Sequence, residues 1–277
     1  MPNFKVAIIK TTNYSESEKS LLRAFDLLGG AQKFFKPTQR VLLKPNLLRP
    51  AAPETAATTH PEIIKALINI IKSFNANVII GDSPGSSSAE TVLKKLDLLD
   101  FLKKNNIKIY DAFDSVDISK KIADRQIKFK VSRAAVETDF IISAAKLKTH
   151  GQMIYTGAIK NLFGLVPGAL KPELHFKLPD NQKFAQMIVD LFEIFTPNLA
   201  IIDAIVAMEG NGPGSGNPKK LNALIVSENA LAADICALKI IDQPLNEVPI
   251  INQAIQRKLG PTVFEEIDLL GDSIDTF

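Results

Sequence analysis

Short apolar runs alternate along this chain with segments of helical period. The runs that predict strands are Lys5–Ile9, Arg40–Leu43, Asn77–Ile80, Lys108–Tyr110, Asp139–Ala144, Asn198–Ile202 and Leu221–Val226. Within several of them, such as 78–80 and 140–142, consecutive positions are apolar and do not alternate with polar ones. This pattern is typical of parallel strands that helices cover on both faces. A weaker, partly exposed strand pair is predicted over 118–122 and 128–131.

Between the strands, apolar residues recur with the spacing of amphipathic helices. One stripe runs from Ile63 to Ile71 and another from Phe184 to Phe195. Thr59 and Glu62 have the spacing of a capping box before the first stripe, and Asn229 is predicted to cap a third helix over 231–241. Strands that alternate with helices predict an α/β fold, with a mostly parallel sheet and helices on both faces.

A chain of 277 residues can form one large α/β domain, and two lobes around a cleft, about 1–150 and 151–277, are the alternative. The net charge of +3 is small and evenly scattered, so we do not expect nucleic-acid binding. The N-terminal apolar run is too short for a signal peptide and no stretch could span a bilayer, which predicts a cytoplasmic protein without membrane contact. The single cysteine, Cys236, lies in an apolar helical pattern and is expected to be buried; alone, it cannot hold an iron–sulfur cluster.

Polar residues follow four of the predicted strands directly. These strands run into Lys44-Pro-Asn46, Gly81-Asp-Ser-Pro-Gly85, Lys146-Leu-Lys148-Thr-His150 and Asp203 with Glu209-Gly-Asn211. If the strands are parallel, all four ends lie at the carboxyl edge of the sheet, where α/β proteins bind ligands. Together with one residue of a later segment, they form the predicted ligand-binding set: Lys44, Asn46, Asp82, Ser83, Lys146, Lys148, Asn161, Asp203, Glu209 and Asn211.

The chain has three histidines, His60, His150 and His175, and none lies in an apolar stripe. Each stands beside proline, lysine or glycine, or in a predicted loop or helix start, a setting that suits acid/base chemistry or metal ligation by imidazole. His60 and His150 are the candidate proton-transfer residues, and His175 is the candidate metal ligand.

Lys160 stands in a segment, Gly157–Gly168, that predicts a short helix closed by Gly164, with Ile159, Leu162 and Phe163 packed below it. A lysine above an apolar bed can have a lowered ammonium pKa, which a nucleophilic or Schiff-base lysine needs. A surface lysine that extends its amine into solvent is the alternative.

At these residues the sequence resembles the family called domain of unknown function 362. The motifs that carry the resemblance are Val41-Leu-Leu-Lys-Pro-Asn46, Thr59-His-Pro61, Gly81-Asp-Ser-Pro-Gly85, Lys146-Leu-Lys-Thr-His150, Lys160-Asn-Leu-Phe-Gly164, Pro167-Gly168 with Lys171 and His175, and Asp203 with Glu209-Gly-Asn-Gly-Pro213. Many relatives carry a ferredoxin-like module after this domain. Since this chain ends at Phe277 without one, the resemblance implies that any cluster would come from a partner.

More distantly, the spacing of His150, Lys160 and His175 is similar to that of the nickel-pincer lactate racemase family. That resemblance implies that Lys160 carries the cofactor covalently, that His175 ligates nickel, and that His150 moves the proton. The context Lys160-Asn161 departs from that family's Arg-Lys-type pattern.

Three functions are compatible with the sequence. The first is a cytoplasmic enzyme or cofactor-binding protein that performs redox or isomerisation chemistry on a carboxylate- or phosphate-bearing small molecule in a cleft lined by lysine and histidine. The second is a non-catalytic electron-transfer partner of a ferredoxin-like protein. The third is a metal-binding protein with all three histidines around one ion.

Overall fold

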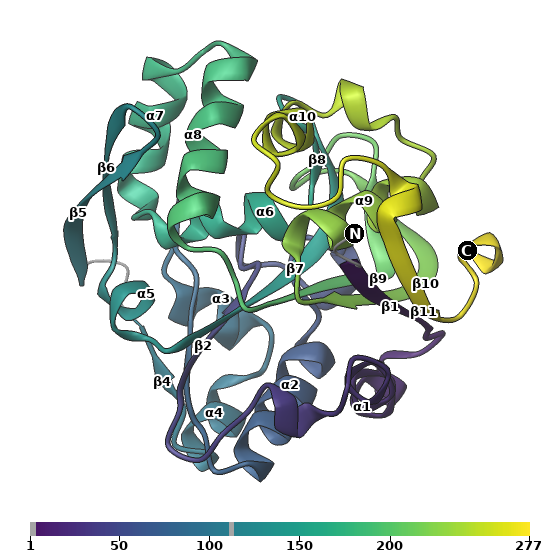
Figure 1. The fold of residues 1–277 in the computed structure, drawn as a ribbon. Coiled ribbons are helices and arrows are strands. Elements are labelled where there is room, and N and C mark those ends of the chain that lie inside the picture. The colour runs from purple at the N-terminus through teal and green to yellow at the C-terminus, as the bar shows by residue number, and fades with distance from the viewer. Residues whose placement is uncertain (1–3, 111–113) are drawn as a thin grey trace.

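The computed structural model describes residues 4–110 and 114–277, and its framework is a nine-stranded sheet (Figure 1). The strands of this sheet are β1 (Phe4–Lys10), β2 (Arg40–Pro45), β3 (Asn77–Ile80), β4 (Lys108–Ile109), β7 (Phe140–His150), β8 (Ile154–Thr156), β9 (Leu199–Glu209), β10 (Asn217–Ser227) and β11 (Ile267–Gly271). Their order is β11-β1-β10-β9-β7-β2-β3-β4, and β8 pairs with β7 at the side. A separate hairpin is formed by β5 (Ser115–Ile122) and β6 (Arg125–Ser132), as the sequence predicted.

The sheet is mostly parallel, which confirms the predicted fold class. Strands β9, β7, β2, β3 and β4 run in the same direction. The exceptions are β10, which pairs antiparallel with both β9 and β1, and the short β8, which pairs antiparallel with β7. Because β2, β3, β7 and β9 are parallel neighbours, their carboxyl ends meet at one edge.

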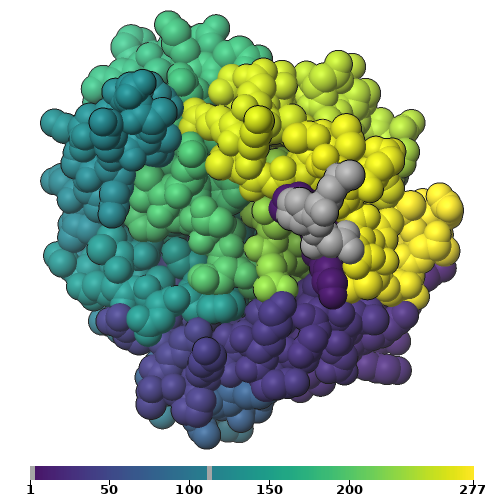
Figure 2. All heavy atoms as spheres, in the orientation of Figure 1, coloured from purple at the N-terminus to yellow at the C-terminus, as the bar shows by residue number. Residues whose placement is uncertain are grey.

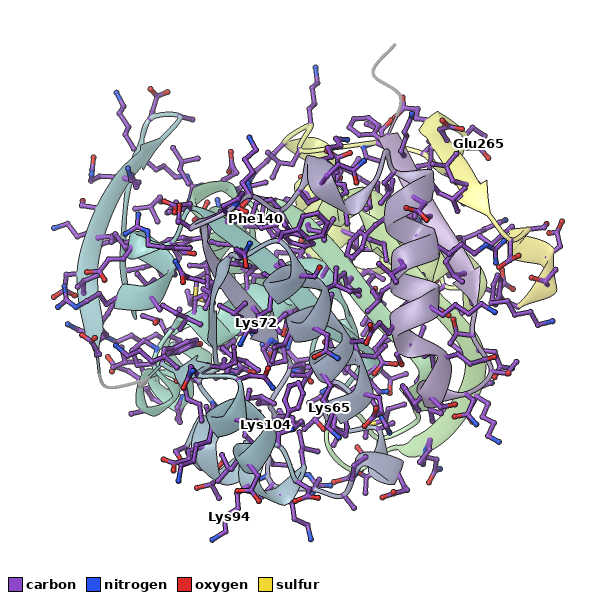
Figure 3. All side chains as sticks on the ribbon, turned by 90° about the horizontal axis from the view of Figure 1, so that it is seen from below. Lys65, Lys72, Lys94, Lys104, Phe140 and Glu265 are labelled. Atoms are coloured by element: carbon purple, nitrogen blue, oxygen red, sulfur yellow. The ribbon has the colours of Figure 1, made fainter. Side chains whose placement is uncertain are left out.

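Helices cover both faces of the sheet (Figure 1). On one face lie α1 (Ser17–Leu27), α2 (Pro61–Ser73), α3 (Ala89–Lys95) and α4 (Leu99–Lys104). On the other lie α5 (Arg133–Glu137), α6 (Ala158–Asn161), α7 (Lys171–Lys177), α8 (Asn181–Ile194), α9 (Ala230–Ile240) and α10 (Pro249–Gln256). Figure 2 shows the two layers as blocks of different colour, with the N-terminal third of the chain below and the later segments above. In Figure 3 the lower layer is seen from outside, with Lys65 and Lys72 on the surface of α2.

The core has two halves, one on each face of the sheet. Neighbouring residues of a strand alternate between them: Leu42 packs with α6, α8 and α9, and Leu43 packs with α1 and α2. Cys236 is fully buried in the first half, as predicted. The predicted lobe boundary at residues 150 and 151 falls between β7 and β8, which pair with each other.

The N-terminal ends of α9 and α2 show whether the predicted capping residues are correct. Asn229 accepts a hydrogen bond from the backbone N–H of Ala232 at 2.9 Å, which confirms it as the cap of α9. The predicted capping box at Thr59 is wrong. Thr59 Oγ1 instead accepts from the N–H of Asn46 and donates to the carbonyl of Ala144. The N-cap of α2 is His60, whose Nδ1 accepts from the N–H of Glu62 at 3.3 Å.

Two of the predicted strand-end loops are strand in the structure. β7 continues to His150 and β9 continues to Glu209, so Lys146, Lys148 and Asp203 are strand residues. The sequence did not predict these strand extensions, because strand predictions rest on apolar runs and the residues here are polar. In the described residues no helix is long and apolar enough to cross a bilayer.

Candidate functional site

A cavity of about 550 Å³ opens at the carboxyl edge of β2, β3 and β7, under α6 and α7. Eight residues that the sequence predicted for the site line it together: Asn46, Asp82, Ser83, Lys148, His150, Lys160, Asn161 and His175. The basic side chains in its wall are Arg49, Lys148, Lys160 and Lys171, whereas Asp82 is the one carboxylate among the described residues that line it. Positive charge therefore exceeds negative charge in this cavity.

Asp82 is held by a buried ion pair and does not face the cavity as a free carboxylate. Lys44 Nζ donates to Asp82 Oδ1 at 3.0 Å, and both side chains are almost fully buried. The N–H groups of Leu47 and Ser83 also donate to this carboxylate. Burial alone would raise the pKa of Asp82, but Lys44 and these hydrogen bonds outweigh it and hold that pKa below its usual value.

Lys44 therefore supports the site and does not line the cavity. Its Nζ also donates to Asn161 Oδ1 and to the carbonyl of Pro45, so all three of its hydrogens have acceptors. Asn161 Nδ2 donates in turn to the carbonyl of Lys44 and to Ser143 Oγ. This network ties α6 to β2 and to the β3 loop.

Gly164 allows this network to close, because its Cα lies directly over the ion pair. A Cβ at this position would lie 1.7 Å from Asp82 Oδ1 and 2.6 Å from Lys44 Nζ. The carbonyl of Gly164 accepts from the N–H of Ser83 and from the hydroxyl of Tyr110. The segment that follows Lys160 is thereby held close to the β3 loop.

Lys160 belongs to α6, a single helical turn that Asp234 of α9 holds at its N-terminal end. Asp234 accepts from the N–H groups of Ala158 at 2.6 Å and Ile159 at 3.0 Å, and from the hydroxyl of Tyr155 at 3.0 Å. Burial raises the pKa of Asp234 to about 6, although these three hydrogen bonds favour its charged form. The predicted short helix over a buried apolar bed is confirmed, since Ile159, Leu162 and Phe163 are buried below it.

The amine of Lys160 has no acceptor. No hydrogen bond or ion pair to Nζ is formed within residues 4–110 and 114–277, although Nζ lies in a cavity wall with other lysines. Burial, followed by the charges of Lys171 and Lys44, lowers the pKa of Lys160 to about 7. Lys171 has a pKa lowered to about 8, mainly by burial, and its Nζ donates to the carbonyl of Ser83.

Lys148 is the third lysine of the cavity, and it is bonded to neutral groups. Its Nζ donates to Asn46 Oδ1 at 2.6 Å and to the carbonyl of Ala57 at 2.9 Å. Burial, followed by the charges of Lys160 and Lys146, lowers the pKa of Lys148 well below its usual value. The cavity wall thus lacks the negative charge that would keep its lysines protonated.

His150 and His175 each present one ring nitrogen that the described residues leave free. His150 Nδ1 accepts from the N–H groups of Gln152 and Met153, so the proton of its neutral ring is on Nε2. His175 Nδ1 contacts Gln152 Oε1 at 3.1 Å, which leaves Nε2 as an acceptor, and its ring stacks on Phe184. Burial and then the charge of Lys160 lower both pKa values, that of His150 to about 2.

A second polar cluster lies on the opposite face of the sheet, among α1 and α2. Lys146 Nζ donates to Asp203 Oδ2 and to the hydroxyl of Tyr14, each at 2.9 Å. Tyr14 donates to Asp203 Oδ1 and stacks on the ring of His60 with centroids 3.5 Å apart. Burial lowers the pKa of His60 to about 4. Lys146, Asp203 and His60 were predicted for the site, but the structure places them in this cluster and not in the cavity wall.

We expect Tyr14→Phe to lower the free energy of unfolding by about 1–3 kcal/mol, because the change removes one buried hydrogen-bond partner from each of Lys146, Asp203 and the N–H of Val206. Urea unfolding measures this loss. Unchanged stability would contradict the role of the Tyr14 hydroxyl in holding this cluster together.

The last two predicted ligand-binding residues lie at the turn between β9 and β10, outside the cavity wall. Glu209 forms an exposed ion pair with Lys219 at 2.8 Å. Asn211 is exposed, and its carbonyl accepts from the N–H of Ser215. From this turn, Pro213 and Gly214 reach the cavity, and the carbonyl of Gly214 fixes Arg49.

The three-histidine metal site is wrong. His60 lies on the other face of the sheet, stacked on Tyr14. In the described part of the chain no group of three or more histidine, cysteine, aspartate or glutamate side chains could hold a metal ion. The donor set of the cavity, two imidazoles and a free amine, does not fit a metal ion bound by the protein alone.

Sequence reasoning assigned no role to three residues that build this site, Arg49, Lys171 and Asp234, or to Tyr14 of the second cluster. Asp234 had a usable signal, because it is an acid inside the otherwise apolar helix 230–238 and such residues are buried only with partners. Tyr14 and Arg49 carried no signal, since each comes from an irregular segment whose contacts are distant in sequence.

The fold and the cavity define an α/β protein with a basic site, containing histidine, at the carboxyl edge of a mostly parallel sheet. The chain belongs to the family described as Domain of unknown function (DUF362), whose model matches residues 41–239. The match covers β2 to α9 and so includes every wall residue of the cavity.

One known protein is similar to this chain in sequence and another in structure. A thylakoid-associated protein of Synechocystis sp. (strain ATCC 27184 / PCC 6803 / Kazusa) is 33% identical, over 94% of this chain and 81% of that protein. Among solved structures, the lactate racemase apoprotein from Thermoanaerobacterium thermosaccharolyticum superposes with a TM-score of 0.52 at 14% identity. That match covers 90% of this chain but 58% of the other one, and it shows a shared fold.

Proposed function

We propose that this protein binds an anionic small molecule, bearing a carboxylate or a phosphate, in the cavity and attaches it covalently through the amine of Lys160. The observation that carries the proposal is the Nζ of Lys160, which has no partner among the described residues and lies in a wall with more basic than acidic groups. A bound anion would supply the missing negative charge to Lys148, Lys160 and Lys171.

The chemistry that suits Lys160 is imine formation. With a pKa of about 7, about half of the amine is neutral at pH 7 and can attack a carbonyl carbon. The carbonyl oxygen leaves as water, and the nitrogen keeps a double bond to the former carbonyl carbon. A protonated imine withdraws electrons from the neighbouring carbon, so a proton there becomes easier to remove, which supports isomerisation as the reaction class.

His150 is the group we assign to hydrogen bonding with the ligand. Its Nδ1 accepts from two backbone N–H groups, so its Nε2 carries the proton and is the atom that meets the ligand. Burial and the neighbouring lysines keep the free ring neutral, with a pKa of about 2. His150 can therefore donate a hydrogen bond to an oxygen of the ligand, whereas its Nε2 cannot accept a proton in this tautomer.

A resident cofactor would be held in the same way. Lys160 fits the attachment of a carbonyl- or acyl-bearing group, and His175 Nε2 fits a single additional contact to it. A metal could enter only as part of such a group, because the described side chains do not supply three ligands.

The test is reductive trapping with 4-formylbenzoate and cyanoborohydride at pH 7, followed by peptide mass spectrometry. We expect one adduct, at Lys160, that inorganic phosphate suppresses and that Lys160→Met abolishes. Lys177→Met is the matched control, because Lys177 lies on neighbouring α7, is exposed and pairs with Glu173; its adduct yield should equal that of the wild type. Labelling spread over exposed lysines, with none at Lys160, would refute the proposal and favour a non-catalytic binding role.

A further inference from the structure

A second cavity, of about 570 Å³, lies directly beside the first. Both cavities are lined by Ser83, Pro84 and Gly85, so the loop that follows β3 forms their common wall. The base of this wall is fixed: the N–H of Gly168 donates to Ser83 Oγ at 2.6 Å, and a Cβ on Gly168 would meet the carbonyl oxygen of Pro84 at 2.0 Å.

The two cavities differ in charge. No lysine or arginine is among the described residues that line the second one, and its single charged residue is Glu90. The rest of its wall combines apolar or aromatic residues with serine hydroxyls. The apolar or aromatic residues are Pro84, Ala89, Ile109, Tyr110, Pro167 and Ala169, and the serines are Ser83, Ser87 and Ser88. Ser87 Oγ is buried without a hydrogen-bond partner in the described part of the chain, and a buried hydroxyl is normally paired.

We propose that the second cavity is a subsite for the uncharged, ring-bearing body of the ligand whose anionic head occupies the first cavity. This inference rests on the proposed function and specifies its ligand class: an aryl or cyclic phosphate or carboxylate with a hydrogen-bonding group within reach of Ser87. The apolar wall accommodates the ring, the lysines bind the head, and the ligand passes over Gly85.

Substitution of Gly85 can test whether one ligand extends from the first cavity into the second. A Cβ built on Gly85 meets no other heavy atom within 4 Å, and its φ lies outside the left-handed range, so other residues fit there without strain. We expect a large side chain at 85 to extend over the common wall and to separate the two cavities.

The experiment compares inorganic phosphate, phenyl phosphate and 1-naphthyl phosphate by calorimetry. Because the chain has no tryptophan, naphthyl fluorescence can be read without that background. We expect 1-naphthyl phosphate to bind wild type on the order of a hundredfold more tightly than phosphate, since burial of the rings adds an apolar contribution. In Gly85→Phe the gain, measured against that variant's own affinity for phosphate, should fall to about threefold or less.

Two controls separate this inference from the proposed function. Gly85→Ala should keep most of the naphthyl gain, because one methyl group leaves the crossing open. Lys160→Met should weaken phosphate and naphthyl phosphate by the same factor. Equal affinity of wild type for phosphate and naphthyl phosphate, or a gain that survives Gly85→Phe, would overturn the second subsite alone. Absence of phosphate binding by wild type would instead overturn the proposed function.

Discussion

Gly164→Ala should destabilise the protein by about 3–5 kcal/mol, the cost of breaking a buried ion pair. The added Cβ would occupy the space of Asp82 Oδ1, at 1.7 Å, and would approach Lys44 Nζ at 2.6 Å. Neither side chain has an alternative position with solvent, because both are almost fully buried. The displacement would also separate the carbonyl of Gly164 from the N–H of Ser83. Guanidinium unfolding followed by circular dichroism measures the loss.

The control for this prediction is Gly85→Ala, an identical change in a glycine of the adjoining loop. Its added Cβ meets no atom within 4 Å, so we expect the free energy of unfolding to change by less than about 0.5 kcal/mol. The two variants add the same methyl group and differ in the atoms that this group would contact. If Gly164→Ala costs less than about 1 kcal/mol, the ion pair does not depend on the close approach described here.

The sequence predicted Gly164 correctly as a special position but gave the wrong reason. We expected a glycine that closes the helix, which would need a left-handed conformation. In the structure Gly164 lies inside a 3₁₀ turn, and its φ is not positive. Its role is the close approach to Asp82 from β3, and contacts between such distant segments leave no pattern in local sequence.

The parallel sheet was predictable because buried strands are apolar, and it correctly placed polar groups at one edge. What the sequence could not decide was which lysine is free. Lys44 and Lys160 both follow apolar segments, yet Lys44 has three acceptors and Lys160 has none within the described chain. Whether a lysine has hydrogen-bond acceptors depends on the residues that surround it in three dimensions, and spacing along the sequence does not reveal them.

The separation of Lys146 from Lys148 shows a further limit. Residues two apart in a strand normally share a face, so alternation predicts that both lysines point to one site. The register between β7 and β9 shifts between these two residues, however. Lys146 joins Tyr14 and Asp203, whereas Lys148 lines the cavity. A bulge of this kind is set by the pairing of two strands, so neither strand's own sequence marks it.

Two demands on the same lysines oppose each other as pH changes. Anion binding is strongest when Lys160 and Lys171 are protonated, and it weakens as pH rises through about 7 and then about 8. Attack on a carbonyl requires the neutral amine of Lys160, whose fraction grows as pH rises through about 7. The product of the two quantities is largest between these limits, so the lowered pKa values favour a site that works near neutral pH.

The pH dependence of trapping should therefore separate an anionic aldehyde from a neutral one. With 4-formylbenzoate, which stays anionic above pH 5, we expect a bell-shaped rate of adduct formation at Lys160 with its maximum near pH 7–8. With benzaldehyde the rate should rise through about pH 7 and then stay level, because no anion binding is lost. At pH 7 Lys160 should react on the order of a hundredfold faster than exposed Lys177, whose amine has no such burial. Stopped-time trapping with peptide quantification measures both rates. An optimum above pH 9 for both aldehydes would show that Lys160 has an ordinary amine, and the proposed chemistry would then lose its basis.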